Sequence, residues 1–314
     1  MKLPYEEFDL SGIQTYPLRS RQSKVGLPQF ATPYKAGSGL AGFLKTLPGV
    51  LAASDFTRVV SAITAAKQGG KPIIWGIGAH VLKTGLSPVL VDLMERGFVS
   101  AVATNGAGII HDFEIALSGA TSEDVDASLG PGTFGMAEET GSQLNRAIAE
   151  GVTGAMGLGQ SVGKYLHEAK PAFTQISLAA SAYRMEIPLT VHVALGTDII
   201  HMHPQASGAA IGEASLRDFK YFVSCVARLQ GGVYLNCGSA VVLPEVFLKA
   251  VAIARNEGKS LDGLTTVNLD FLRHYRPLTN VVTRPTAGIG TGYSLTGHHE
   301  LLIPLLAAAL IESS

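Results

Sequence analysis

The sequence has few cysteines and no apolar run long enough to cross a membrane. Two cysteines, Cys225 and Cys237, in 314 residues cannot build a disulfide framework, which fits a reducing compartment. The longest apolar run, LLIPLLAAALI at 301–311, falls short of the roughly 20 residues of a membrane helix. The opening MKLPYEEFDLSG lacks the basic start and apolar core of a secretory signal. We therefore expect a cytoplasmic protein with no membrane partner.

Charge is also scarce. Charged residues make up 16% of the chain, the net charge is −1, and no run of lysine or arginine occurs. This balance argues against a nucleic-acid partner. Hydrophobic residues make up 46%, with a mean hydropathy of +0.27. Without a membrane span, this excess is typical of a parallel sheet covered on both faces and of a homo-oligomer with buried interfaces.

The chain divides into two parts. Residues 1–50 are rich in turn residues and predict an irregular N-terminal arm, which either wraps the domain or a neighbouring subunit, or is partly disordered. Residues 51–314 predict a single α/β domain. Short helices are expected at 39–47 and 55–68.

From Lys71 onward, short β-rich runs alternate with helical stretches of about ten to fifteen residues. This alternation indicates βαβ units and a Rossmann-like parallel sheet with helices on both faces. The expected strands are 72–75, 99–103, 189–194, 232–235, 265–269 and 280–283. The expected helices are 87–96, 112–118, 137–150, 172–184, 215–229, 244–256 and 300–312. At 215, the letters SLRD have the form of an N-cap followed by an acidic residue.

Glycine and polar residues follow the expected strands, where ligands bind in such sheets. The turns are Gly76-Ile77-Gly78-Ala79-His80, Thr104-Asn105-Gly106-Ala107-Gly108, Gly196-Thr197-Asp198, Asn236-Cys237-Gly238-Ser239 and Asn268-Leu269-Asp270. Small residues at such turns allow backbone N–H groups to approach a phosphate. None of these turns has the complete G-x-G-x-x-G pattern of dinucleotide-binding sites. Each turn taken alone is therefore also consistent with an ordinary tight βα turn. Their convergence on one edge predicts a dinucleotide site.

Histidines gather at the same strand ends. Seven of the nine lie within or just beyond them: His80, His111, His192, His201, His203, His298 and His299. One interpretation is a zinc or iron site, for which His80, His111, His201 and His203 are the candidates. General acid–base chemistry and simple hydrogen bonding around a polar pocket are the alternatives. Because no HExxH or CxxC spacing occurs, metal is the less favoured of these interpretations.

Taken in order, these turns resemble the deoxyhypusine synthase family from about Lys71 to the C-terminus. The segments that carry the resemblance are IIWGIGAHVLKTG, VSAVATNGAGIIHD, IPLTVHVALGTDIIHMHP, LQGGVYLNCGSAVVLPEVFLKAVAIARN, LTTVNLD and LTGHHELLIPLLAAAL. The resemblance implies a deoxyhypusine-synthase-like NAD-binding fold and a homotetramer with sites at dimer interfaces. It also implies NAD contacts at Gly76, Gly78, His80, Thr104, Asn105, Gly106, Gly108, Asp270, Gly297 and His298.

The sequence departs from that family at its reactive positions. The resemblance places the family's imine-forming lysine at Leu243, and an isobutyl group cannot form an imine. Two acidic positions of the family correspond to Ile110 and His111, while Asp112 is retained. Ala79 and His80 replace a serine and an asparagine. These departures argue against deoxyhypusine synthesis and a dicationic substrate.

We therefore expect an NAD-dependent transferase or oxidoreductase that acts on a small amine-type substrate. His203 is the acid–base candidate, His111 and Asp112 line the pocket, and Lys83 is a possible amine nucleophile. Two alternatives stay open. One is a histidine-rich metal-dependent enzyme on the same fold, and the other is a non-enzymatic dinucleotide-binding protein.

Overall fold

The computed structural model describes residues 4–313 as a six-stranded parallel sheet flanked by helices. The strand order is β3-β2-β1-β4-β5-β6, and every neighbouring pair is parallel. The strands are β1 (Ile73–Ile77), β2 (Ala101–Asn105), β3 (Leu189–His192), β4 (Val233–Cys237), β5 (Thr265–Asp270) and β6 (Thr291–Thr296). The predicted α/β class with a Rossmann-like parallel sheet is confirmed.

The central strand β1 shows why this sheet forms. All five residues of IIWGI are buried, as expected for a strand covered on both faces. Successive side chains alternate, so Trp75 enters one apolar cluster and Ile74 enters the other. The larger cluster packs α2, α4, α9 and α13 against the sheet, and the smaller one packs α10 and α11 against its other face.

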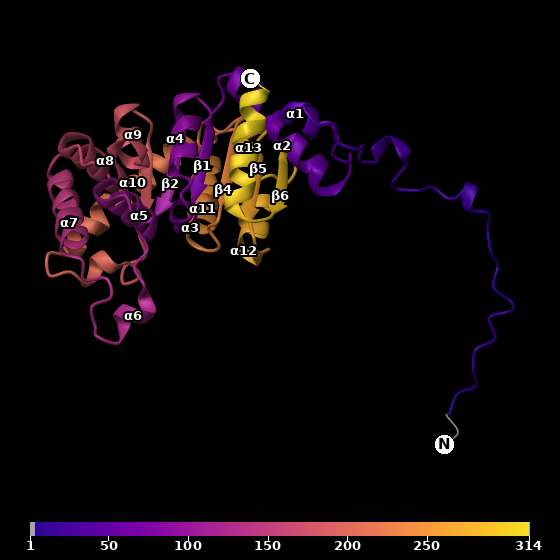
Figure 1. Cartoon of the computed structure of the whole chain (residues 1–314), viewed down its shortest axis with the longest axis horizontal. Coiled ribbons are helices and arrows are strands. Elements are labelled where there is room, and N and C mark those ends of the chain that lie inside the picture. The colour runs from indigo at the N-terminus through magenta and orange to yellow at the C-terminus, as the bar shows by residue number, and fades with distance from the viewer. Residues whose placement is uncertain (1–3, 314) are drawn as a thin grey trace.

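Helices surround this sheet on both sides (Figure 1). The helices before β3 are α1 (Gly39–Leu44), α2 (Leu51–Gln68), α3 (Ala79–Lys83), α4 (Ser87–Glu95), α5 (Gly106–Ser118), α6 (Val125–Leu129), α7 (Glu138–Thr153), α8 (Leu158–Ala169) and α9 (Leu178–Arg184). After β3 come α10 (Gly208–Val226), α11 (Val242–Asn256), α12 (Tyr275–Pro277), the π-helix η5 (Leu278–Thr283) and α13 (His299–Glu312). The short 3-10 helices are η1 (Leu18–Ser20), η2 (Leu27–Gln29), η3 (Thr174–Ile176) and η4 (Ile199–Met202). Among residues 4–313, none of the helices combines the length and the apolar character that crossing a bilayer would require.

The segment before α1 leads away from the sheet as an extended arm (Figure 1). Ten of its large apolar side chains are exposed: Tyr5, Phe8, Leu10, Ile13, Tyr16, Leu18, Val25, Leu27, Phe30 and Tyr34. From residue 4 to residue 26 its hydrogen bonds are local, such as the one from the Ile13 N–H to the Leu10 carbonyl. Farther along, the Thr32 N–H donates to the Thr46 carbonyl and the Gly49 N–H donates to the Gln29 carbonyl. Residues 4–26 therefore do not wrap their own domain in this structure, and wrapping around a neighbouring subunit stays a prediction.

Two sequence predictions fail in the second half of the sheet. Residues 280–283 were expected to form a strand, yet they belong to η5. The Asn280 side chain explains this, because it donates to Glu245 and accepts from Arg284, which fixes a helical turn beside α11. The last strand is instead β6, whose partly exposed TGYSLT sequence gives a weak strand signal.

Several helix boundaries also differ from expectation. Helix α8 was missed, and α5 begins at Gly106 rather than at Asp112. Helix α10 begins seven residues before Ser215, and its N-cap is Ser207, whose side chain accepts from the Ala210 N–H. The SLRD sequence therefore lies inside a helix and is not a cap.

Leu243 lies in the apolar core, away from solvent. Its side chain is 0% exposed and packs in the smaller cluster with Tyr234 and Phe247. Its N–H donates to the Ser239 hydroxyl at the start of α11. Position 243, where the resemblance places the family's imine-forming lysine, therefore holds a core side chain in this structure. Packing accounts for the leucine there, and its correspondence with the family's lysine stays a prediction. Lys249, on the same helix, is exposed and pairs with Glu245.

The outer edge of β3 is closed by side chains of α10 in place of a seventh strand. The Asp218 carboxylate accepts from the N–H groups of Val191 and Gly159 at 2.8 and 2.9 Å. The Ser215 hydroxyl donates to the Val191 carbonyl and accepts from the Val193 N–H. Asp218 thus connects β3, α8 and α10. Burial raises its pKa to about 7, although the backbone N–H groups act in the opposite direction.

Replacement of Asp218 tests this connection. Asp218→Ala leaves two buried N–H groups without an acceptor and is expected to lower the free energy of unfolding by about 3 kcal/mol. Asp218→Asn keeps one carbonyl oxygen and is expected to cost less. Chemical denaturation of the three proteins measures both differences.

The same proteins reveal the titration of Asp218. Between pH values of about 4 and 7, the folded chain holds a proton that the unfolded chain has released, so the contribution of Asp218 to stability falls as pH rises. It stays constant above about pH 7. The wild type should therefore lose stability relative to Asp218→Asn between about pH 5 and about pH 8. An equal difference at both pH values contradicts the shifted pKa.

Candidate functional site

The carboxyl ends of β1 and β4 meet at a very close backbone contact. The Gly78 N–H donates to the Cys237 carbonyl at 2.8 Å. A Cβ at Gly78 would lie 2.1 Å from the Gly238 carbonyl oxygen, and Gly238 itself has a φ of +69°. Only glycine permits both features. The order of the strands changes direction between β1 and β4: β2 and β3 lie beyond β1, whereas β5 and β6 lie beyond β4. In open α/β sheets, ligands bind at such a switch point.

Four aromatic rings gather beside this contact. His80 of α3 lies 5.7 Å from both Phe271 and His299, measured between ring centroids. Phe271 lies 6.0 Å from His298, with the two rings nearly parallel. His80, Phe271 and His298 are exposed, whereas His299 is buried beneath them. These four residues, called the ring cluster below, form an aromatic surface at the ends of β1, β5 and β6.

Asp270 and Gly297 join the ring cluster to the sheet. The Gly297 N–H donates to the Asp270 carbonyl at 3.0 Å, across the ends of β5 and β6. His299 Nε2 lies 3.2 Å from the Leu269 carbonyl oxygen. Because a carbonyl oxygen only accepts, Nε2 carries the hydrogen of this bond. Burial lowers the pKa of His299, opposed by this carbonyl and by the charge of Asp270. The structure thus brings together four of the predicted cofactor-binding residues, His80, Asp270, Gly297 and His298.

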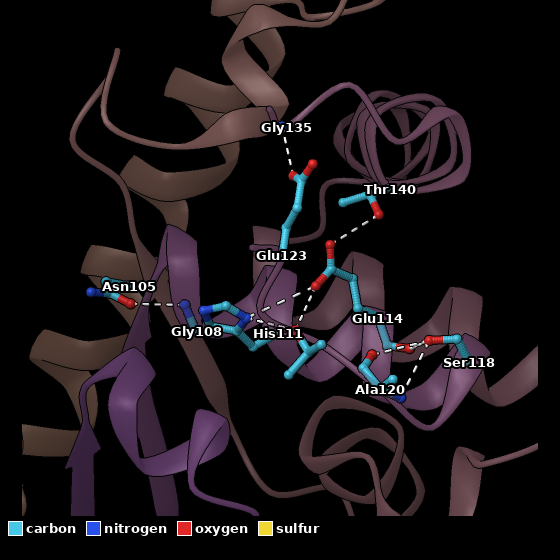
Figure 2. A network of polar contacts seen from close by, with 10 residues as sticks. Asn105, Gly108, His111, Glu114, Ser118, Ala120, Glu123, Gly135 and Thr140 are labelled. Carbon is cyan, nitrogen blue, oxygen red and sulfur yellow. Dashed lines mark hydrogen bonds and ion pairs between the residues drawn. The ribbon is translucent and has the colours of Figure 1, made fainter. Parts of the chain in front are cut away.

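A second polar group lies on α5 (Figure 2). His111 Nδ1 is 2.7 Å from the Thr121 hydroxyl, which donates its own hydrogen to Glu114 at 2.5 Å. Thr121 therefore accepts from His111, which places the hydrogen on Nδ1 and leaves Nε2 as an acceptor. Glu114 also accepts from the Thr140 hydroxyl, at the start of α7.

The environment of His111 keeps its ring neutral. Burial is the main cause that lowers its pKa to about 4, and the positive charge of Lys83 adds to it. Lys83 ends α3 on the exposed side. Two predicted catalytic residues, His111 and Lys83, are thus close enough to interact. Helix α3 carries His80 toward the ring cluster and Lys83 toward His111, so it connects the two groups.

Most of the small residues of the predicted dinucleotide turns make internal contacts. A Cβ at Gly76 would lie 2.5 Å from the Tyr234 hydroxyl, and one at Gly108 would lie 2.1 Å from the Thr104 hydroxyl. Thr104 itself donates to the Ile77 carbonyl. Asn105 caps α5 by accepting from the Gly108 N–H (Figure 2). Packing therefore explains why these positions hold glycine, threonine and asparagine. This is what the alternative interpretation, ordinary tight βα turns, expects.

The start of α5 already faces an internal carboxylate. A Cβ at Gly106 would lie 1.9 Å from Asp198 Oδ2, and Asp198 interacts with the Ala107 N–H. Burial raises the pKa of Asp198, with opposing effects from His201, Thr197 and Ala107. The expectation that Gly106 would contact a cofactor phosphate is therefore wrong for this structure, because a phosphate there would meet the carboxylate.

The two histidines after β3 contact their own loop and helix α7. His201 Nδ1 accepts from the N–H groups of Gly196 and Asp198. The His203 ring lies against Gly141 of α7, and its Nε2 is 3.6 Å from Glu138. The first turn of α7 thus lies between His203 and the Glu114 group on α5. Across residues 4–313, no set of three or more His, Cys, Asp or Glu side chains is arranged to hold a metal ion. The proposed set His80, His111, His201 and His203 is therefore not a metal cluster.

Asp112 does not line the site. It is 1% exposed, and its carboxylate accepts from the Ser177 hydroxyl and from the N–H groups of Leu178 and Ala179. It therefore caps the start of α9, and the prediction of a pocket-lining Asp112 is wrong. Burial raises its pKa, and these three hydrogen bonds oppose the shift.

Two residues of the site, Glu114 and Phe271, did not emerge from the sequence, and two others, Asp198 and His299, were named at the strand ends without an assigned role. Glu114 lies three positions after His111, which is the spacing of neighbours on one helix face. Phe271 directly follows Asp270, and His299 directly follows His298. Phe271 and His299 could have been chosen because each directly follows a predicted site residue. The contact of Asp198 with α5 depends on the path of the loop, which the sequence does not give.

Comparisons of the sequence with protein-family models and with curated proteins give no match. Solved structures do match. The AgrE complex with ornithine and NAD+ superposes with a TM-score of 0.53 at 16% identity, over 86% of this chain and 35% of that chain. A conserved LOR/SDH protein from Methanococcus maripaludis gives 0.53 at 14% identity, over 84% and 71%. A protein assigned as a deoxyhypusine synthase from Entamoeba histolytica gives 0.51 at 12%, over 90% and 96%.

The chain has the deoxyhypusine-synthase-like fold. Against the last of these structures the match extends over nearly the full length of both chains. By contrast, the chain spans only about a third of the ArgZ and AgrE chains. At identities of 12 to 17%, the comparisons establish the deoxyhypusine-synthase-like fold alone.

The pair formed by Lys83 and His111 yields a direct prediction. In the wild type, NMR titration of the histidine ring should give His111 a pKa of about 4. Lys83→Gln removes a repelling charge and should raise that pKa, though it stays below the ordinary value because burial is the larger cause. Lys249→Gln, on an exposed ion pair of α11, should leave it unchanged. An unchanged His111 pKa in Lys83→Gln would show that the two side chains do not interact.

Proposed function

We propose that the chain is an NAD-binding enzyme that acts on a small amine-type substrate, as an oxidoreductase or a transferase. The observation that carries this proposal is the ring cluster beside the Gly78–Gly238 contact, at the switch point of the sheet. The matching AgrE structure contains NAD+ and ornithine, which supports a dinucleotide and an amine on this fold. Leu243 has no role in this proposal, because its side chain is buried in the core.

The residues present fit a nicotinamide dinucleotide. Phe271, His80 and His298 offer exposed ring faces on which a base can stack. Asp270 ends β5 beneath this surface; it is 3% exposed and accepts from the Leu272 N–H, so it holds the turn that carries Phe271. The Gly78–Gly238 contact brings two backbone segments together without side chains, which permits close approach of a pyrophosphate. When bound, NAD would supply a hydride acceptor at this edge.

His111 and Lys83 are the groups that we assign to proton transfer and substrate binding. With its hydrogen on Nδ1 and its pKa lowered, His111 is neutral near pH 7 and offers Nε2 as the acceptor for a substrate N–H. The low pKa makes it a weak base, so a proton taken from the amine passes on to water. Lys83 repels a protonated amine and favours the neutral one. His203 remains an acid–base candidate across the first turn of α7.

NAD+ titration by calorimetry tests the binding part. We expect binding to the wild type, weakened about tenfold by Phe271→Ala and by His80→Ala, since stacking contributes roughly 1–3 kcal/mol per base. Tyr275→Ala is the matched control, because it removes an exposed aromatic ring four residues beyond Phe271. With NAD+ bound, short primary amines such as ornithine or putrescine should produce reduced nicotinamide, and His111→Gln should slow this without changing NAD+ affinity.

Each arm of this experiment can fail separately. The proposed cofactor site is contradicted if calorimetry detects no NAD+ binding. It is also contradicted if Phe271→Ala binds NAD+ as tightly as the wild type does. Binding without any amine-dependent reduction would instead favour the non-enzymatic dinucleotide-binding protein.

We further propose a homo-oligomer that uses the N-terminal arm, with a tetramer as the expected size. The arm exposes ten large apolar side chains and leads away from its own sheet (Figure 1). Exposed apolar side chains in such density are unfavourable in water, and burial of each is worth about 1.5–3 kcal/mol. A neighbouring subunit would bury them.

Removal of residues 1–34 is expected to lower the oligomeric state, as measured by light scattering after size exclusion. The domain should stay folded, because the helices that cover the sheet begin with α2 at Leu51. A matched variant that replaces Phe8, Tyr16 and Leu27 by serine should have the same effect. An unchanged mass for both proteins would show that the arm takes no part in assembly.

A further inference from the structure

We propose that a hollow between α8, α9, α10 and the start of β3 is a second ligand site, which takes a small organic ammonium ion. The hollow has a volume of about 680 Å³, within the range of small-molecule sites. It borders the first residues of β3, at Pro188–Thr190. It therefore lies at the opposite edge of the sheet from the ring cluster, which follows the strands' carboxyl ends.

The hollow combines apolar walls with polar groups that have no partner. Ala179, Ala182 and Ile187 contribute apolar surface. Around them lie Gln160, His167, Tyr183, Glu186 and Tyr221. Within residues 4–313, neither tyrosine hydroxyl, nor the Gln160 amide, nor the Glu186 carboxylate makes a hydrogen bond or an ion pair, so these groups are available to a ligand.

The charge around the hollow favours a cation. Glu186 is an unpaired carboxylate at the hollow. Asp218 lies in the inner wall, but it is buried and its carboxylate accepts from the N–H groups of Gly159 and Val191, so Glu186 carries the charge. Arg184 also borders the hollow, but it pairs with Glu95 at 2.8 Å, which cancels its charge. Lys170 lines a separate, neighbouring hollow of about 380 Å³. The unbalanced charge that faces the larger hollow is therefore negative.

Aromatic rings around the hollow provide the matching surface for an organic cation. The rings of His167 and Tyr183 lie 5.5 Å apart, and Tyr221 presents a half-exposed ring from α10. Ammonium groups are attracted to the faces of such rings, and the apolar body of the ligand can cover the alanines between them. An inorganic cation would leave the apolar walls uncovered, so an organic amine fits better.

The end of helix α9 positions Glu186 at the hollow. Its φ is +56°, the left-handed conformation that commonly terminates a helix. The Ile187 N–H donates to the Ala182 carbonyl and the Glu186 N–H to the Tyr183 carbonyl, which closes the last turn of α9. The helix end therefore holds the exposed Glu186 carboxylate beside the hollow without an ion-pair partner.

Benzylammonium is a suitable probe, with benzyl alcohol and benzoate as neutral and anionic analogues of the same shape. We expect calorimetry to show binding of benzylammonium to the full-length protein and at least tenfold weaker binding of both analogues. Glu186→Gln and Tyr221→Ala should each weaken benzylammonium binding about fivefold, from loss of the charge and of the ring face. Circular dichroism confirms that both variants are folded.

Glu213→Gln is the matched control, because Glu213 lies on α10 but pairs with Arg217 outside the hollow. It should bind benzylammonium as the wild type does. Saturating NAD+ should not displace the probe, which separates this site from the proposed cofactor site at the ring cluster. The proposal is overturned if benzoate binds as tightly as benzylammonium, if both folded hollow variants keep wild-type affinity, or if NAD+ competes with the probe.

Discussion

The backbone contact between Gly78 and Gly238 determines the geometry of the edge that carries the candidate site. Because the Gly238 carbonyl occupies the space of a Gly78 side chain, the ends of β1 and β4 lie as close as a parallel sheet permits. Helix α3 then starts directly at this contact and turns His80 and Lys83 to different sides. The ring cluster and the His111 group are therefore held at fixed positions relative to each other. A side chain at Gly78 would force the two turns apart and separate both groups.

The buried and half-buried polar residues divide into two kinds. Asp112 and Asp218 tie elements together through backbone N–H groups, so their charges serve architecture. His111 and the ring cluster instead keep atoms or ring faces unused by the fold. This difference, rather than residue type, identifies the candidate site. It also explains why several glycines of the predicted dinucleotide turns prove structural, since Gly76, Gly106 and Gly108 accommodate neighbouring side chains.

The sequence was sufficient to predict the sheet because its central strands are short, apolar and followed by glycine. The sequence also predicted that His80, Asp270 and His298 lie near one another at the carboxyl ends of the strands, and the structure places them there, while their role in a site stays a proposal. It could not separate Asp112 from His111, because which face of α5 meets α9 depends on tertiary packing. The β-branched run at 280–283 was misread for a similar reason, since Asn280 is held by Glu245 from a distant helix. The sequence also could not show that the Leu243 side chain lies in the core, because a motif match gives no side-chain direction.

Hydrogen–deuterium exchange with and without NAD+ tests the central claim most directly, because it reports where the dinucleotide binds on the intact chain. The account predicts slower exchange in the segments 78–83, 238–242, 270–275 and 296–300. No change is expected at 158–167 or 183–190, which border the second hollow. Protection confined to those latter segments, or to the start of α5 alone, would contradict the proposal that the cofactor binds at the ring cluster.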